Sequence, residues 1–402
     1  MTTVFPDASI PALFGGDPVF QRRLPLARPP VGDPSAVASQ IAPILESGMI
    51  TNGENVRKFE AAAADYLGVR HCVAVSSCTA GLMLVVRALG LSGEVIVPSF
   101  TFAATAHAVA WNGVRPRFAD IDPRTLTLSP EEVSQVIGVR TSAILATHIF
   151  GTPCDVDGLA EIARRTGIAL LFDAAHAFGS IHGGEHVGGF GDAEVFSLSP
   201  TKVLTAGEGG IIATNNDLLA ERCRIGRDYG NPGDYDCRFV GLNARMSEVH
   251  AVIGLDSMVG LEERLSARNE IAEAYHSALE GVPGLSFPEV PSSDRSTYKD
   301  FTALIDEDEF GIDSRSLADA LEAEGVETRR YYSPPVHTMR AYRSLSSANG
   351  SLAVTDRISD QVLTLPLWVG MSDREIAGVT DAIIRIHEYM PRGAEASEGR
   401  SQ

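Results

Sequence analysis

Cysteine is scarce in this 402-residue chain, and long apolar runs are absent. The cysteines, an odd number with no CxxC pair and no metal-type spacing, favour reduced thiols and predict no metal site. No stretch approaches ~18 consecutive apolar residues, so the sequence predicts no membrane span. A basic segment followed by an apolar run, the mark of a signal peptide, is also missing from the first residues. We therefore expect a cytoplasmic protein.

Basic residues are likewise few. Lysine and arginine total 33 against 52 aspartates and glutamates, which gives a net charge of −19. Nucleic acid or an anionic membrane would require a basic face, so neither is expected as a partner. An anionic small substrate remains compatible, because a local pocket can be positive on an acidic protein.

The first half of the chain alternates between strand and helix patterns. Strands are predicted at 71–75, 94–97, 117–119, 143–147, 169–173, 193–197 and 211–214, and helices at 54–67, 80–89, 102–111, 130–137, 156–166 and 217–226. Several strands are apolar on both faces, which is typical of a mainly parallel sheet sandwiched by helices. The predicted fold class is α/β with a smaller C-terminal α+β domain.

Domain boundaries follow from these patterns. We predict an N-terminal arm at 1–34, a large α/β domain at 35–260, a small α+β domain at 261–390 and a disordered tail at 391–402. The helical region 247–279 is expected to bridge the two domains. In the small domain we expect a strand at 301–305 and helices at 314–324 and 373–388.

Lys202 lies between the predicted strand at 193–197 and a turn rich in glycine. Most lysines are solvated surface residues, and that alternative stays open on local sequence alone. In an apolar pocket, however, desolvation would lower the pKa of this lysine and leave part of it as the free amine. The free amine is the form that makes Schiff bases with carbonyl groups.

Two further positions lie where ligands bind in parallel sheets, at the carboxyl ends of strands. Asp173 ends an otherwise apolar strand, so it either faces a cationic partner or caps the next helix. His176 follows and either reaches the same crevice or packs as a polar side chain. Near 76–79, a strand runs through Ser-Ser-Cys-Thr into a helix, which predicts an anion site unless Thr79 is only an N-cap.

Lysine, strand-end aspartate and helix start together match the needs of pyridoxal 5'-phosphate. The lysine forms the Schiff base, the carboxylate keeps the pyridine nitrogen protonated, and the helix start holds the phosphate. Each residue alone is a weak signal, and their order along an α/β chain is a stronger one.

The sequence also resembles the DegT/DnrJ/EryC1/StrS sugar aminotransferases, which have the fold-type I aspartate aminotransferase architecture. The resemblance runs from about residue 46 to 388, and its most specific motifs are SGMITNGENVRKFE, VAVSSCTAGL, EVIVPSFTFAAT, ATHIFGTPCDVDGL, LLFDAAHAFGS, EVFSLSPTKVLTAGEGGIIAT, GLNARMSEVHAVIGL and RRYYSPPVH. It implies that Lys202 is the Schiff-base lysine and Asp173 the partner of the pyridinium nitrogen. His176 would lie beside the phenolic oxygen of the cofactor, and Phe102 would stack on its ring.

The resemblance also implies the phosphate contacts: Thr79, the backbone of Ala80, Ser197 and, reaching in from a neighbouring subunit, Asn243. It therefore implies a homodimer with shared sites. Outside that context Phe102 is typical of a core, Ser197 of a strand and Asn243 of a turn.

Substrate contacts are expected from Tyr331, Tyr332 and His337. Arg329 and Arg330 either meet a diphosphate or are ordinary surface charges.

Two departures from the family pattern are visible. Cys78 stands where many relatives have Gly, and His176 stands where Gln is commoner. A branch of the family replaces the lysine with His and performs dehydration, so the retained Lys202 favours transamination.

By resemblance, the amino donor is L-glutamate and the acceptor a nucleotide-linked keto sugar. The motifs look most like the branch that aminates C4 of dTDP-4-keto-6-deoxyglucose in the deoxysugar pathways of antibiotic biosynthesis. The alternatives are a C3, UDP-sugar, GDP-sugar or aminocyclitol aminotransferase. A cyclising or dehydrating relative and a non-catalytic regulator that keeps the fold are further alternatives.

Overall fold

The computed structural model describes residues 10–30, 32–346 and 351–390. Within them, the largest sheet is mainly parallel, and only β9 runs antiparallel to its neighbours β1 and β8. Its strands, in spatial order, are β1 (His71–Val75), β9 (Gly210–Thr214), β8 (Ala193–Ser197), β5 (Ala169–Asp173), β4 (Thr141–Thr147), β2 (Glu94–Pro98) and β3 (Arg115–Ala119). The α/β fold class is confirmed.

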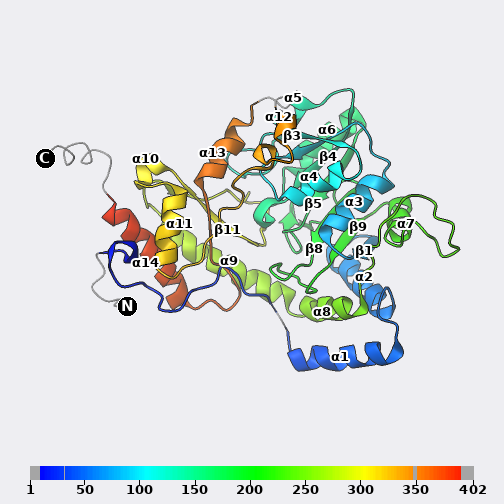
Figure 1. The fold of residues 1–402 in the computed structure, drawn as a ribbon, viewed down its shortest axis with the longest axis horizontal. Coiled ribbons are helices and arrows are strands. Elements are labelled where there is room, and N and C mark those ends of the chain that lie inside the picture. The colour runs from blue at the N-terminus through cyan, green and yellow to red at the C-terminus, as the bar shows by residue number, and fades with distance from the viewer. Residues whose placement is uncertain (1–9, 31, 347–350, 391–402) are drawn as a thin grey trace.

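Helices cover both faces of this sheet (Figure 1). They are α2 (Glu54–Leu67), α3 (Cys78–Ala88), α4 (Ala103–Ala110), α5 (Pro130–Val136), α6 (Val156–Thr166), α7 (Asp217–Gly226) and α8 (Glu248–Met258). Alternation along the strands divides the core: Val73 and Val75 pack with α3, α4 and α7, whereas Cys72 and Ala74 pack with α2 and α8. Burial on both faces explains why the strands read as continuous apolar runs.

A second core surrounds a small antiparallel sheet of β10 (Leu285–Ser286), β11 (Phe301–Ile305) and β12 (Val362–Leu365). The helices of this part are α9 (Leu261–Leu279), α10 (Glu307–Phe310), α11 (Ser314–Ala323), α13 (Ala353–Gln361) and α14 (Asp373–Tyr389). The remaining elements are α1 (Pro34–Ser47), α12 (Arg343–Ser346), the short pair β6 (Ile181–His182) and β7 (Glu185–His186), and single 3₁₀ turns at Ala12–Phe14, Ile149–Gly151 and Val336–Thr338.

The described part of the N-terminal arm lies against this second core (Figure 1). Leu24 is buried in it, and the buried carboxylate of Glu324 accepts hydrogen bonds from the amides of Ala12 and Val19 at 2.8 and 3.1 Å. In the opposite direction, Val336 and Tyr342 pack into the core of the large sheet. The C-terminal part of the chain thus contributes side chains to both cores.

Element boundaries follow the predicted ones within about two residues, and α2, α6, α7, β1, β5, β8 and β11 coincide with them. The region expected to be helical over 247–279 is broken, because the chain turns at Val259 and at Gly260, which has φ +68° and separates α8 from α9. The predicted tail at 391–402 lies outside the described residues. Among those described, no helix combines the length and apolar character that a membrane span requires.

Candidate active site

A cavity of about 310 Å³ lies at the carboxyl ends of β5 and β8. The register of the two parallel strands pairs Asp173 with Val195, so that the loops after both strands open on the same side. The cavity is lined by Ser77, Cys78, Thr79, Phe102, Ala104, Asp173, Ala175, His176, Ser197, Ser199, Thr201, Lys202, Glu208, Gly209, Lys299, Asp300, Tyr331 and Tyr332.

Lys202 reaches this cavity from a loop whose two ends are joined by backbone hydrogen bonds. The amide of Leu198 donates to Gly209 O at 3.0 Å, and the amide of Ala206 donates to Leu198 O at 2.9 Å. Burial is the main cause that lowers the pKa of Lys202 to about 8; the Lys299 ammonium acts in the same direction, whereas Asp300 and Asp173 oppose it. About one tenth of the amine is therefore unprotonated at pH 7, far more than for an ordinary lysine.

Asp173 is buried, with 4% of its surface exposed. Its Oδ2 accepts the hydroxyl hydrogen of Thr105 at 2.7 Å, and its Oδ1 accepts the amide of Ala175 at 3.1 Å. Burial raises the pKa of the Asp173 carboxyl, although both hydrogen bonds and Lys202 favour its ionised form. A cationic ligand group next to Asp173 would complete the pairing of this carboxylate.

The start of α3 forms the opposite end of the cavity. Ser77 caps the helix by accepting the amide of Ala80 at 3.1 Å, so the amide of Ala80 is already used. The helix therefore presents the amides of Cys78 and Thr79, next to the hydroxyls of Thr79, Ser197 and Ser199. A Cβ on Gly210 would come within 2.6 Å of the amide nitrogen of Cys78, so the missing side chain makes room for this close approach.

Aromatic rings close the cavity on its outer side. Phe102 is 62% exposed, and its ring centroid lies 6.3 Å from that of Tyr332. Tyr332 in turn stacks on Phe150 with centroids 6.3 Å apart, while Tyr331 lies beside it. An exposed Phe that lines the cavity is available to a planar ligand.

Five predicted residues do not line the cavity: Ala80, Asn243, Arg329, Arg330 and His337. The amide of Ala80 was expected to bind the phosphate, but it is already donated to Ser77. The His337 ring is held by Ser99, with Oγ and Nδ1 2.7 Å apart, and by Asp356, with Nε2 and Oδ1 3.2 Å apart, so it secures the 331–338 loop. Arg329 pairs with Glu327 at 2.6 Å and lines a neighbouring groove, and Asn243 is exposed away from the cavity. Arg330, whose guanidinium bonds Ser314 and the carbonyls of Ser359 and Asp360, is likewise absent from its lining.

The buried ion pair of Lys299 and Asp300 is among the cavity features that the sequence did not predict. Nζ lies 2.6 Å from Oδ1, and 8% and 4% of the two side chains are exposed. The sequence carried one signal for them: two adjacent charges directly before the apolar strand β11. A pair at the start of a buried strand is a candidate for a buried site.

Comparison with known proteins decides the family. A model of the DegT/DnrJ/EryC1/StrS aminotransferase family matches residues 35–384. The chain belongs to this family. It is 31% identical to GDP-perosamine synthase of Vibrio cholerae over 88% of this chain and 98% of that protein. It is also 31% identical to the spore coat polysaccharide biosynthesis protein SpsC of Bacillus subtilis (strain 168) over 90% and 96% of the two chains.

Solved structures of similar proteins agree with this assignment. DesI, crystallised in the presence of its TDP-sugar product, superposes with a TM-score of 0.89 at 38% identity over 95% of this chain and 97% of that one. DesV of S. venezuelae superposes with a TM-score of 0.84 at 32% identity over 89% and 95% of the two chains. The protein is therefore a sugar aminotransferase that depends on pyridoxal phosphate.

The cavity of this family member fits that cofactor. Lys202 offers a partly unprotonated amine, the buried Asp173 offers a carboxylate for a ring nitrogen, and the close approach of Gly210 to the start of α3 leaves free amides for a phosphate. Among the described residues, no group of three or more His, Cys, Asp or Glu side chains is arranged to hold a metal ion.

Proposed function

We propose that this chain transfers the amino group of L-glutamate to C4 of dTDP-4-keto-6-deoxyglucose, in the biosynthesis of deoxyaminosugars for antibiotics. The observation that carries the proposal is the joint presence of Lys202, Asp173 and the start of α3 in one cavity. Pyridoxal phosphate, when bound there, supplies an electron-withdrawing ring that makes the C–H bond of the amino donor acidic.

Lys202 is the residue that moves the proton. Because burial lowers the pKa of Lys202 to about 8, its amine both accepts and returns a proton near neutral pH. Positioned acid–base catalysis of this kind contributes roughly 10²–10⁴ in rate. Asp173 holds a proton on the cofactor's ring nitrogen, and the amides and hydroxyls at the start of α3 bind the phosphate.

The choice of acceptor rests on sequence resemblance to the C4 branch and on similarity to DesI, whose structure was determined with its TDP-sugar product. A groove of about 480 Å³ adjoins the cavity, and Phe102, Tyr331 and Tyr332 line both. Arg329 lines the groove as well, and its side chain, which pairs with Glu327 at 2.6 Å, is 48% exposed; a bound diphosphate would compete with Glu327 for this guanidinium. We assign the groove to the nucleotide-linked end of the sugar.

A homodimer is part of the proposal. Asn243 is exposed and contributes nothing to the cavity of its own chain, which suits a residue that serves a neighbouring subunit. Exposed apolar side chains lie close to it in sequence or in space: Tyr229, Tyr235, Val240, Met49 and Ile50. The backbone of 50–52 bonds to that of Met246 and Glu248, which brings Met49 and Ile50 close to the segment that follows Asn243.

We also propose a cytoplasmic location. The five cysteines are all free thiols, and four of them are buried, which suits a reducing compartment.

The test is full turnover with defined acceptors. The purified protein, loaded with pyridoxal phosphate and supplied with L-glutamate, is offered dTDP-4-keto-6-deoxyglucose, its 3-keto isomer, a GDP-linked 4-keto-6-deoxy sugar and a keto-cyclitol. We expect kcat/KM for the first to exceed the others at least about 10-fold, and NMR of the product to show nitrogen on C4. Nitrogen on C3, or preference for another acceptor, would contradict the substrate assignment while leaving the aminotransferase assignment intact.

A further inference from the structure

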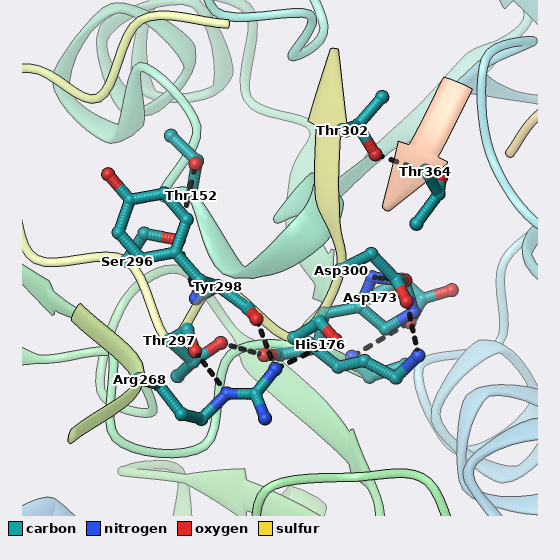
Figure 2. Close-up of polar contacts among 12 residues, drawn as sticks. Thr152, Asp173, His176, Arg268, Ser296, Thr297, Tyr298, Asp300, Thr302 and Thr364 are labelled. Atoms are coloured by element: carbon teal, nitrogen blue, oxygen red, sulfur yellow. Dashed lines mark hydrogen bonds and ion pairs between the residues drawn. The ribbon is translucent and has the colours of Figure 1, made fainter. Parts of the chain in front are cut away.

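Two buried polar atoms in the cavity face each other without a hydrogen-bond partner. They are Nδ1 of His176 and Oδ2 of Asp300, 4.0 Å apart (Figure 2). His176 is 8% exposed and Asp300 6% exposed. A buried polar atom that has no hydrogen-bond partner is destabilising, so the two are each other's natural partners after a small movement.

The backbone that carries Asp300 is tied to the backbone of His176. The hydroxyl of Thr297 donates to His176 O at 2.6 Å. The buried guanidinium of Arg268 donates to the carbonyls of Thr297, Tyr298 and Lys299, as Figure 2 shows for the first two. These contacts hold the segment 297–300 against the loop after β5, so the spacing of the two side chains is built into the fold.

The surrounding charges determine whether Nδ1 of His176 or Oδ2 of Asp300 carries the hydrogen of this bond. Burial alone would raise the pKa of Asp300, but Lys299, His176 and Lys202 lower it overall, so this carboxyl is ionised and only accepts. Burial lowers the pKa of His176 well below its usual value; Lys202 and Lys299 act in the same direction and Asp300 opposes them. A neutral imidazole carries one hydrogen, on Nδ1 or on Nε2.

We propose that Asp300 is a positioning residue that accepts the Nδ1 hydrogen of His176 and thereby leaves Nε2 as a hydrogen-bond acceptor toward the cavity. Any ligand atom that meets Nε2 must then supply the hydrogen itself. A Gln at this position offers both a donor and an acceptor, so Asp300 gives His176 a selectivity that Gln lacks. For the reaction, this inference rests on the proposed function, because only a bound cofactor or substrate makes use of Nε2.

The test reads the tautomer directly, in the full-length protein without cofactor or substrate. Two-bond ¹H–¹⁵N correlation spectra of protein labelled at its 10 histidines distinguish hydrogen on Nδ1 from hydrogen on Nε2. His176→Gln assigns the signal. In the wild type we expect the hydrogen of the His176 ring on Nδ1. In Asp300→Leu, which removes the acceptor, we expect this hydrogen on Nε2. In Lys299→Met, which keeps the Asp300 carboxylate, we expect it to remain on Nδ1.

A matched control exists in the same chain. Asp294 accepts from Nδ1 of His182 at 3.0 Å outside the cavity, so Asp294→Asn should change the His182 signal and leave that of His176 unchanged. Hydrogen on Nε2 of His176 in the wild type would overturn the inference even if Asp300→Leu failed to fold. Retention on Nδ1 in a folded Asp300→Leu would overturn it too. Because no aminotransfer is measured, failure of the proposed function cannot be mistaken for failure of this inference.

Discussion

The amine of Lys202 shares its cavity with a cation and an anion that move its pKa in opposite directions. The ammonium of Lys299 lowers the pKa of Lys202 and the carboxylate of Asp300 raises it, while burial lowers it most. Since the two charges pair with each other at 2.6 Å, their effects on Lys202 partly cancel. Removal of only one of the two charges should therefore move the pKa of Lys202 away from about 8.

Single substitutions should separate these two effects. Lys299→Met removes the cation and should raise the pKa of Lys202, whereas Asp300→Asn removes the anion and should lower it, each by on the order of 1 pH unit. The readout is the rate at which pyridoxal phosphate forms its absorbing adduct with cofactor-free protein, as a function of pH. Because only the free amine reacts, the wild-type rate should rise with pH through about 8. Movement of both midpoints in the same direction would contradict this account.

At the level of single residues, sequence reasoning found those whose local context was unusual. Lys202 lies between a buried strand and a glycine turn, and Asp173 ends an apolar strand, and the structure places both in the cavity. For Asp300 the local signal was only two adjacent charges before an apolar strand, because its role comes from packing against a loop more than 120 residues earlier, where Thr297 bonds to His176. His337 looked like a ligand residue, but its two ring nitrogens are held by Ser99 and Asp356.

Among the elements, the start of α3 depends on its contact with β9. Gly210 begins β9 opposite Val75, and a Cβ there would meet the amide of Cys78 at 2.6 Å and Phe196 O at 2.9 Å. Both neighbours are backbone atoms, which cannot move aside as a side chain does. The helix start therefore stays in place only while residue 210 lacks a side chain.

Gly210→Ala should displace the start of α3 and weaken the binding of the cofactor's phosphate group there. Loss of one hydrogen bond to a charged group is worth about 1.5–3 kcal/mol, so the affinity for pyridoxal phosphate should fall at least about 10-fold. The affinity is measured by titrating the cofactor-free protein with pyridoxal phosphate and following the absorption. Gly189→Ala is the matched control, because a Cβ there meets nothing closer than 3.5 Å. Equal affinities in the two variants would rule out this role for Gly210.

The prediction of elements from sequence worked where apolar spacing was regular and less well elsewhere. The helices α2 and α6 have clear periodicity and ended where predicted, at Gly68 and Gly167. The break between α8 and α9 was missed, because Gly260 inside a helical pattern does not by itself distinguish a tolerated glycine from a turn with φ +68°. The reversed direction of β9 is a matter of topology, which apolar spacing does not report.

For the whole molecule, the proposed dimer makes each active site depend on two chains. If Asn243 serves the neighbouring subunit, a mixed dimer of Lys202→Ala and Asn243→Ala contains one complete site, made of Lys202 from one chain and Asn243 from the other. Random assortment makes half of the dimers mixed, so refolding the two weakly active variants together should restore up to about one quarter of wild-type activity. Each variant refolded alone is the control. Activity equal to the average of these controls would show that Asn243 does not act across an interface.

Lys202 is the amine that moves the proton while the amino group of L-glutamate passes to the cofactor in the proposed reaction. The decisive measurement is the absorption spectrum of the protein loaded with pyridoxal phosphate, recorded before and after addition of L-glutamate, for the wild type and Lys202→Ala. We expect the wild-type band to convert to that of the aminated cofactor, and the rate in the variant to be lower by at least about 10²-fold. A wild-type band that no amino donor changes, or a variant that converts as fast as the wild type, would contradict the central claim.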